Sequence, residues 1–474
     1  MSQLTRNLGL TATVSVIVGG IIGSGIFMKP AFMASQLPNP WIILSVWIVA
    51  GCITLFGALC NAEVASMMPV TGGQYVFFEK MYGKKFAFVY GWAAFSVFNT
   101  AGNASVSYIC ASYTEYFFQL PDLSRNIVDK FILHIPFIGK FYPLEDWGLK
   151  FYTIIFVAGL TLLNYKSVNL GVGVQKLLTF LKIFAFGLLI GGFLLSNKGS
   201  MSHFSVTTFE TPNQVSFLSA YMACIVAAFW GYDGWNNIIF IAGEIKEPHR
   251  NIPKGLFWGI LICIGIYALI NFGYFYILPA ETVAHTPLVA TKAAEVAMGG
   301  KAAIFISLLI ILSTLGAANA NIFATSRITY TMGNENRMFK FFKAGEIHPI
   351  NKTPGKALII NMVWSSLLII SGSFDMLTDM LIFVSWFFYG ASGLGLFILR
   401  FKMKDTPRLY KTWGYPVVPA IFVIFVLVML VQTLITDIFN YTHEKSNVIN
   451  SVLGLCITLI GLPLFWLSKD KIKK

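Results

Sequence analysis

The stretch that decides the fold lies in the first long apolar segment, where residues 18–27 read VGGIIGSGIF. Four of these ten residues are glycine. A glycine inside a helix costs about 1 kcal/mol relative to alanine, so the cluster favours an unwound turn within the segment. The same small residues would also suit a packing groove for a neighbouring helix, and their spacing alone does not separate the two interpretations.

The composition of the whole chain identifies the membrane as its solvent. Of its 474 residues, 56% are hydrophobic and only 12% are charged, which excludes an ordinary soluble or disordered protein. Apolar runs recur between Leu8 and Leu467, and each exceeds the roughly 20 residues that a helix needs to cross the bilayer. These runs do not alternate apolar and polar residues, so a transmembrane barrel is excluded. We predict an all-α membrane protein.

The breaks between the apolar runs predict twelve transmembrane helices, centred near residues 19, 55, 103, 160, 186, 231, 265, 317, 360, 388, 426 and 458. The formal net charge is +13, and basic residues gather in every second connection, as in residues 80–85, 246–254 and 400–411. Cytoplasmic loops carry such an excess. We therefore predict a multi-pass protein of the cell membrane with both termini in the cytoplasm, and no nucleic acid partner.

The sixth apolar segment contains a second anomaly, because residues 229–237 read FWGYDGWNN. This places a carboxylate, two amides and two glycines near the middle of the membrane. A carboxylate at that depth costs at least about 2.5 kcal/mol, so Asp233 is expected to face protein or a water-filled cavity. It could instead cap a helix half or pair with another buried group.

The spacing of the two anomalies is more informative than either one alone. The first and sixth spans are an odd number of spans apart, so they cross the membrane in opposite directions. Two interrupted helices at matching places of two halves indicate a transporter site near the midplane. Their free N–H groups suit a carboxylate and their free carbonyls suit an ammonium, and a zwitterionic α-amino acid presents both.

In these residues the chain resembles the amino acid, polyamine and organocation (APC) transporters, and within them the L-type amino acid transporter (LAT) branch. Residues 20–27 and 230–236 are similar to the signatures of that branch's first and sixth helices. Further similarity lies, in the same order as in the family, in residues 60–63, 69–75, 243–253 and 313–327. The resemblance covers essentially the whole chain.

The resemblance implies a leucine-transporter-like fold whose helices 1 and 6 are broken. Residues 1–196 would form a first five-helix repeat, and residues 197–404 a second, inverted one. Residues 405–474 would supply two additional transmembrane helices and a cytoplasmic tail. The substrate would bind between helices 1 and 6.

The resemblance also implies roles for individual residues. The backbone N–H groups of Ser24 and Gly25 would bind the substrate carboxylate, and the carbonyls of Ile21, Trp230 and Asp233 would bind its ammonium. Trp230 would close over the substrate as an aromatic gate, although a tryptophan here could also be ordinary packing. The predicted substrate-binding residues are Ile21, Gly23, Ser24, Gly25, Trp230, Asp233, Trp235 and Asn236.

Two charged residues within the apolar spans also need partners. Lys182 lies in the middle of the fifth span. In similar transporters a lysine on this helix tethers the first broken helix or takes part in proton coupling, and we favour a tether to carbonyls at residues 19–22. The alternative is an ammonium that snorkels to the interface. Glu63, near the inner end of the second span, is expected to be interfacial or paired.

The resemblance implies a sodium-independent exchanger of small to medium neutral L-amino acids that works by alternating access. A proton-coupled symporter and a membrane amino acid sensor are the alternatives. We expect no enzymatic activity, metal or cofactor, because no metal-ligand cluster, nucleotide loop or nucleophile motif is apparent. Mammalian relatives bind a single-span glycoprotein through a cysteine in the outer loop after span three. No cysteine occurs between Cys110 and Cys224, so we expect no disulfide-linked heavy subunit.

Overall fold

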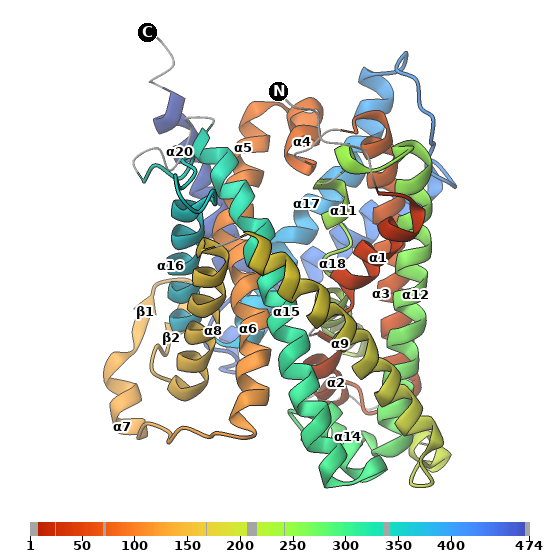
Figure 1. The fold of residues 1–474 in the computed structure, drawn as a ribbon, viewed down its shortest axis with the longest axis vertical. Coiled ribbons are helices and arrows are strands. Elements are labelled where there is room, and N and C mark those ends of the chain that lie inside the picture. Colours follow the sequence, from red (N-terminus) through yellow and green to blue (C-terminus); the bar gives the residue numbers. More distant parts are fainter. Residues whose placement is uncertain are drawn as a thin grey trace. The chain divides into compact units, whose positions relative to one another are not determined.

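The computed structural model describes residues 8–23, 25–69, 73–166, 168–205, 216–240, 242–334 and 342–469. Within these residues the chain is built almost entirely from helices (Figure 1). Seven stretches of the described residues are long and apolar enough to cross a membrane: α3 (Pro40–Met67), α8 (Trp147–Lys166), α12 (Pro248–Ile277), α15 (Gly300–Asn334), α17 (Phe374–Lys402), α18 (Val417–Thr442), and α19 (Asn450–Leu459) with α20 (Gly461–Lys469).

Further apolar helices are shorter or interrupted. The pair α1 (Leu10–Ile21) and α2 (Gly25–Gln36) meets the same test when taken as one bent span. Shorter apolar helices are α10 (Phe217–Tyr232), α16 (Gly355–Ser371) and the part of α9 (Val168–Leu195) from Phe184 to Leu195. The prediction of an all-α, multi-pass membrane protein is therefore confirmed.

The remaining elements are short or lie at the ends of longer helices. They are α4 (Gln74–Tyr82), α5 (Lys84–Ala93), η1 (Ala94–Asn99), α6 (Thr100–Glu115), α7 (Arg125–Val128), η2 (Asp129–Phe131), β1 (Leu133–Ile135), β2 (Gly139–Phe141), η3 (Met201–Phe204), α11 (Asn237–Phe240), η5 (Ala242–Glu244), α13 (Ala280–Ala284) and α14 (Val289–Met298). The strands β1 and β2 form an antiparallel hairpin in which Leu133 pairs with Phe141 and Ile135 with Gly139.

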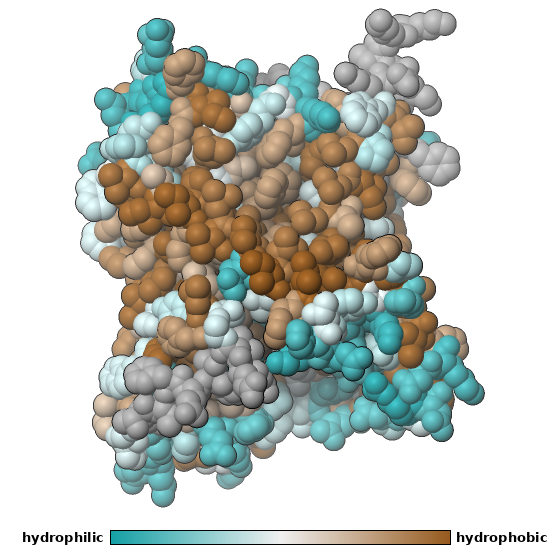
Figure 2. Space-filling view, turned by 180° about the vertical axis from the view of Figure 1, so that it is seen from behind, coloured by the Kyte–Doolittle hydropathy of each residue, from teal (hydrophilic) through white to brown (hydrophobic). Residues whose placement is uncertain are grey.

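Apolar side chains cover the part of the surface that lipid would contact. Figure 2 shows hydrophobic residues gathered over the middle of the visible face and hydrophilic residues toward its top and bottom. Large side chains such as Leu162, Leu427 and Val431 are exposed along spanning helices. Apolar side chains can be exposed to hydrocarbon without a free-energy penalty, so they need not be buried against other protein groups.

The helices fall into two compact units. Unit 1 combines residues 1–90, 192–297 and 385–433, and unit 2 combines residues 91–191, 298–384 and 434–474. In unit 1, α12 packs against α1 and α3, and α10 packs against α2 and α3. In unit 2, α6 packs against α8, α15 and α16. The predicted repeat boundaries after residues 196 and 404 remain predictions.

A π-helical turn interrupts the middle of the third predicted span. The segment η1 lies between α5 and α6 and has the wider turn of a π-helix. The Trp364 indole of α16 donates to the Ser96 carbonyl at 2.8 Å, and the Thr100 hydroxyl donates to the Phe95 carbonyl at 2.7 Å. The first of these bonds joins η1 to α16 inside unit 2, and the second stays within the turn itself.

Candidate functional site

The first predicted break is present at the glycine cluster. Helix α1 ends at Ile21, α2 begins at Gly25, and the two axes are bent by 47°. The first N–H groups of any helix lack carbonyl partners within that helix, and the start of α2 also carries the positive end of a helix dipole. Gly23 lies in the break, whereas Ser24 lies outside the described residues. The predicted contacts of these residues with a carboxylate remain predictions.

The second predicted break is also present. Helix α10 ends at Tyr232 and α11 begins at Asn237, with a turn of four residues between them. Gly234 in this turn has φ of +98°, a conformation that strains any residue with a side chain. The N–H of Asp233 donates to the Trp230 carbonyl at 3.3 Å, which closes the last turn of α10.

The two breaks meet through their glycines. A Cβ atom on Gly25 would lie 2.7 Å from the Gly231 Cα and 3.0 Å from the Trp230 Cδ1. A Cβ atom on Gly234 would lie 2.6 Å from the Gly20 carbonyl oxygen. Both sequence interpretations of the first cluster are therefore correct, because its glycines permit the break and also allow two backbones to approach closely.

The two broken segments run in opposite directions. Helix α2 packs against α10, and α1 packs against α11, so the second half of one segment lies beside the first half of the other. The end of α10 therefore faces the start of α2. A carbonyl end and an N–H end thus lie next to each other, which is the arrangement that a zwitterion requires.

Tyr267 of α12 connects both breaks and was not singled out from the sequence. Its hydroxyl lies 2.8 Å from the Ile21 carbonyl oxygen and 2.7 Å from the Gly231 carbonyl oxygen. The side chain is fully buried and packs edge-on against Trp47, with ring centroids 5.2 Å apart. Tyrosines and phenylalanines are so frequent in this chain that no sequence signal distinguished this one.

Asp233 is paired with a tyrosine of α17. Its Oδ1 accepts a hydrogen bond from the Tyr389 hydroxyl at 3.4 Å. The Tyr389 ring also lies 4.9 Å, centroid to centroid, from the buried Trp235 ring. Two of the possibilities left open by the sequence are observed, because Asp233 pairs with the half-buried Tyr389 and also forms the C-cap of α10.

Asn236 is held by a chain of hydrogen bonds that runs through Asn61 to Ser392. Its Oδ1 accepts from the Asn61 Nδ2 at 3.1 Å, and the Asn61 Oδ1 accepts from the Ser392 hydroxyl at 2.5 Å. Asn236 and Asn61 are both buried. This chain joins α3 and α17 to the second break, so Asn236 positions the turn through these contacts.

Trp230 lies at the contact between the two breaks. Its ring borders Gly25, and its exposed fraction is 6%. The neighbouring Phe229 stacks on Trp386, with ring centroids 3.5 Å apart. These contacts show packing, and the role of Trp230 as a gate remains a prediction.

Lys182 lies on α9 in unit 2 and is 5% exposed. This burial does not fit an ammonium that snorkels to the surface. Its predicted tether to residues 19–22 remains a prediction.

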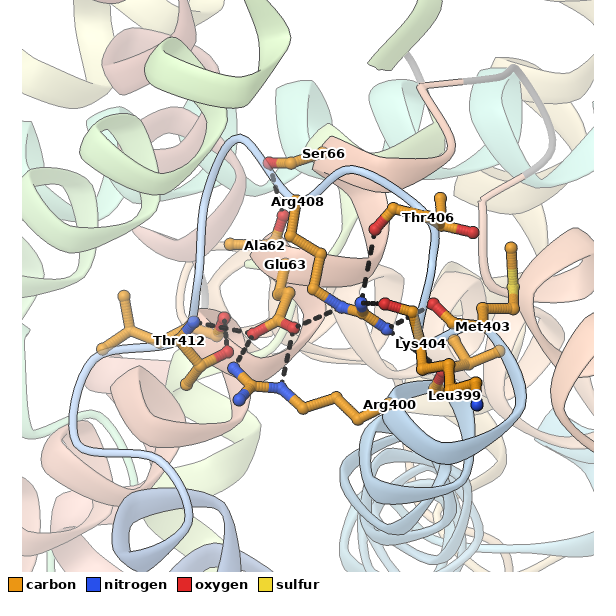
Figure 3. A network of polar contacts seen from close by, with 11 residues as sticks. Ala62, Glu63, Ser66, Leu399, Arg400, Met403, Lys404, Thr406, Arg408 and Thr412 are labelled. Atoms are coloured by element: carbon orange, nitrogen blue, oxygen red, sulfur yellow. Dashed lines mark hydrogen bonds and ion pairs between the residues drawn. The ribbon is translucent and has the colours of Figure 1, made fainter.

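Glu63 of α3 lies at the centre of a buried ion cluster (Figure 3). Its two carboxylate oxygens accept from Arg400 at 2.9 and 2.7 Å, and its Oε2 also accepts from the Thr412 N–H at 2.7 Å. Arg408 lies 3.3 Å from its Oε1. The expectation that Glu63 is interfacial or paired is met by this pairing, which fixes the end of α17 and the following loop onto α3.

Comparison with known proteins agrees with this geometry. The model of the amino acid permease family matches residues 8–461. The chain is 31% identical over 435 residues to the b(0,+)-type amino acid transporter 1 of Homo sapiens, covering 91% of this chain and 82% of that protein. It is 28% identical over 475 residues to the serine/threonine exchanger SteT of Bacillus subtilis (strain 168), covering 99% and 98%. It is 27% identical over 468 residues to the large neutral amino acids transporter small subunit 2 of Mus musculus, covering 98% and 81%.

Broken apolar helices that meet at a pair of opened turns, together with a family match over nearly the whole chain, define a membrane transporter of amino acids and not an enzyme. The chain belongs to the amino acid permease family, and its relatives place it in the LAT branch of the APC transporters. The resemblance stated from the sequence is therefore confirmed.

Proposed function

We propose that the chain is a sodium-independent exchanger of small to medium neutral L-amino acids. The observation that carries this proposal is the meeting of two opened turns at Gly25 and Gly231. The start of α2 suits the substrate carboxylate, and the carbonyls at the end of α10 suit its ammonium. Because both charged groups are common to all α-amino acids, the side chain of the substrate would decide which amino acids are accepted.

The set of helices that makes up unit 1 supports transport by alternating access. Both broken segments, α3 and α12 belong to this unit. In the proposed fold these are the first two helices of each repeat. Substrate that bridges α2 and α10 would stabilise one arrangement of this group of helices, and the group would then move against unit 2 as the site opens to the other side.

The side chains around the second break support a substrate of limited size. Trp230, Trp235 and Tyr389 are large, and all three lie within contact distance of one of the two turns. Two relatives, a serine/threonine exchanger and a transporter of large neutral amino acids, support neutral substrates. The relatives thus support neutral substrates, and the bulky side chains favour those of small to medium size.

We further propose twelve transmembrane helices, with inverted repeats at residues 1–196 and 197–404 and two additional helices in residues 405–474. The antiparallel contact of the two broken segments supports an inverted pair. The basic loops support a cell membrane protein whose termini are both cytoplasmic. The lack of cysteine between Cys110 and Cys224 supports function without a disulfide-linked heavy subunit.

Counterflow tests the proposed exchange. Proteoliposomes loaded with unlabelled L-serine should take up labelled L-serine several-fold faster than empty vesicles, in buffer without sodium. Competition by neutral amino acids, but not by their decarboxylated analogues, would show recognition of both charged groups. Uptake that requires sodium, or that is not stimulated by internal substrate, would rule out this exchange.

The buried Lys182 favours a proton-coupled symporter as the second candidate, since a buried lysine can alternate between charged and neutral forms. The same vesicles separate the two candidates. A pH gradient should drive net uptake into empty vesicles only in the symporter. A pH dependence that survives Lys182→Ala would exclude Lys182 as the group that carries the proton.

Tyr267→Phe is expected to lower the uptake rate about tenfold, because two carbonyls at the breaks lose a buried hydrogen-bond donor at a cost of about 1–3 kcal/mol. The matched control is Tyr276→Phe on the same helix, whose ring stacks on Phe272. Initial uptake rates in proteoliposomes measure both. Equal rates for the two variants would show that Tyr267 does not position the breaks.

A further inference from the structure

The loop between α6 and α8 exposes a group of large apolar side chains. Phe131 is 59% exposed, Ile132 39%, Leu133 55% and Phe137 89%. We call these four residues the hairpin patch, because they lie on or beside the β1–β2 hairpin. A water-facing loop of a soluble protein rarely gathers so many exposed apolar side chains, and such patches indicate an interaction surface.

The scaffold that carries the patch is well defined. The Lys140 N–H donates to the Asn447 carbonyl at 2.8 Å, and the Ile449 N–H donates to the Ile138 carbonyl at 2.9 Å. A Cβ atom on Gly139 would lie 2.2 Å from the Asn447 carbonyl oxygen, so only glycine permits this approach. The hairpin is therefore held against the segment before α19, and the patch is presented by a fixed backbone.

The base of the loop is fixed to two helices of the same unit. The Lys150 ammonium of α8 donates to the carbonyls of Tyr142 at 2.9 Å, Pro143 at 3.3 Å and Ile370 at 3.3 Å. Ile370 lies in the last turn of α16. This lysine joins the loop to the ends of both helices, so the hairpin has a set position beside them.

The helix that follows the hairpin has exposed apolar side chains near its start. Helix α8 begins at Trp147, and its Phe151 and Ile155 are exposed by 47% and 46%. Aromatic residues at the start of a spanning helix are typical of the membrane interface. Figure 1 draws the β1–β2 hairpin level with the turns of α8. The hairpin and the start of α8 thus both expose large apolar side chains.

The backbone of β1 limits the depth that the hairpin can reach. Within the described residues β1 pairs with β2 alone, so its other edge keeps N–H and carbonyl groups without strand partners. Such an edge is not stable in hydrocarbon, whereas water and lipid headgroups satisfy it. Lys130 and Lys140, which flank the patch, are exposed and carry charges that suit phosphate groups.

We propose that the hairpin patch is seated in the interface of the bilayer, with Phe131, Leu133 and Phe137 among the upper acyl chains and the flanking lysines at the phosphates. The partner is phospholipid of the leaflet into which α8 begins. Anchored in this way, the hairpin would fix the tilt of α8 in the membrane.

Depth measurements in single-copy nanodiscs test this proposal. Phe137→Cys and, as a control on the same loop, Asn126→Cys of α7 are each made in a Cys456→Ser background and labelled with an environment-sensitive fluorophore. Asn126 is exposed and polar. Lipid brominated on its upper acyl chains should quench the label at position 137 several-fold more than the label at position 126. Phe131→Cys should behave like Phe137→Cys.

The other outcomes overturn the proposal. Equal quenching at positions 137 and 126 would place the patch in water. Shielding of the label at position 137 that occurs only in discs holding two copies would assign the patch to a second copy of this chain. Counterflow by each labelled protein, which the loop substitutions should leave within twofold of the parent, shows that the fold is intact when the label is read.

Discussion

Gly25→Leu is expected to abolish amino acid uptake, with a loss of at least about 100-fold in the initial rate. The first side-chain atom at this position would lie 2.7 Å from the Gly231 Cα, a distance that requires the two backbones to move apart. The larger side chain would also cover the N–H groups at the start of α2. In the proposed mode of binding, substrate would then lose the contact between its carboxylate and the first break.

The sharper form of this experiment uses a single added methyl group. Gly25→Ala should also lower uptake strongly, because its Cβ alone makes the contact with Gly231. The matched control is Gly19→Ala in α1, where an added Cβ would meet nothing within 4 Å. Both variants should insert into the membrane equally, as judged by size exclusion in detergent. Wild-type uptake by Gly25→Leu would contradict this placement of the site.

Glu63→Gln is expected to destabilise the protein by about 3–5 kcal/mol, because it leaves two largely covered guanidinium groups without their negative partner. The Glu63 side chain is 0% exposed, and those of Arg400 and Arg408 are 20% and 9% exposed. The midpoint of thermal unfolding in detergent, followed by loss of the monodisperse peak, should fall by many degrees.

Two comparisons isolate the charge of Glu63 as the cause. Glu346→Gln removes a carboxylate from an exposed ion pair with Lys356, and this variant should unfold close to wild type because water already solvates that pair. The triple variant Glu63→Gln, Arg400→Gln, Arg408→Gln removes all three charges and should recover part of the loss. If Glu63→Gln unfolds at the same temperature as Glu346→Gln, the cluster does not stabilise the fold.

The Glu63 cluster also has a consequence for transport. Arg400 lies at the end of α17, and Tyr389 on the same helix donates to Asp233 at the second break. Ser392, between them, bonds to Asn61 of α3. The second half of α17 is therefore fastened to α3 and to the break. In the proposed mechanism it would move with the broken helices as unit 1 changes position.

The sequence alone determined the class of fold and the places of the two helix breaks. Apolar runs of transmembrane length predict membrane helices, because hydrocarbon requires apolar side chains and internally bonded backbone groups along the whole span. The glycines around Gly25 and the polar run around Asp233 predict breaks. Glycine in a helix and a carboxylate in the membrane each carry a free-energy cost that depends only on the residue and its immediate surroundings. Both breaks are where these residues lie.

Only the tertiary structure decided which residues support the site. Tyr267 bonds to carbonyls of both breaks, one of them 246 residues away, and Arg400 pairs with Glu63 across 337 residues. No local pattern encodes such a contact, because it depends on which faces of distant helices pack together. Local free-energy costs thus allow the positions of the helix breaks to be predicted from the sequence. Long-range packing decides which side chains hold the opened turns in place.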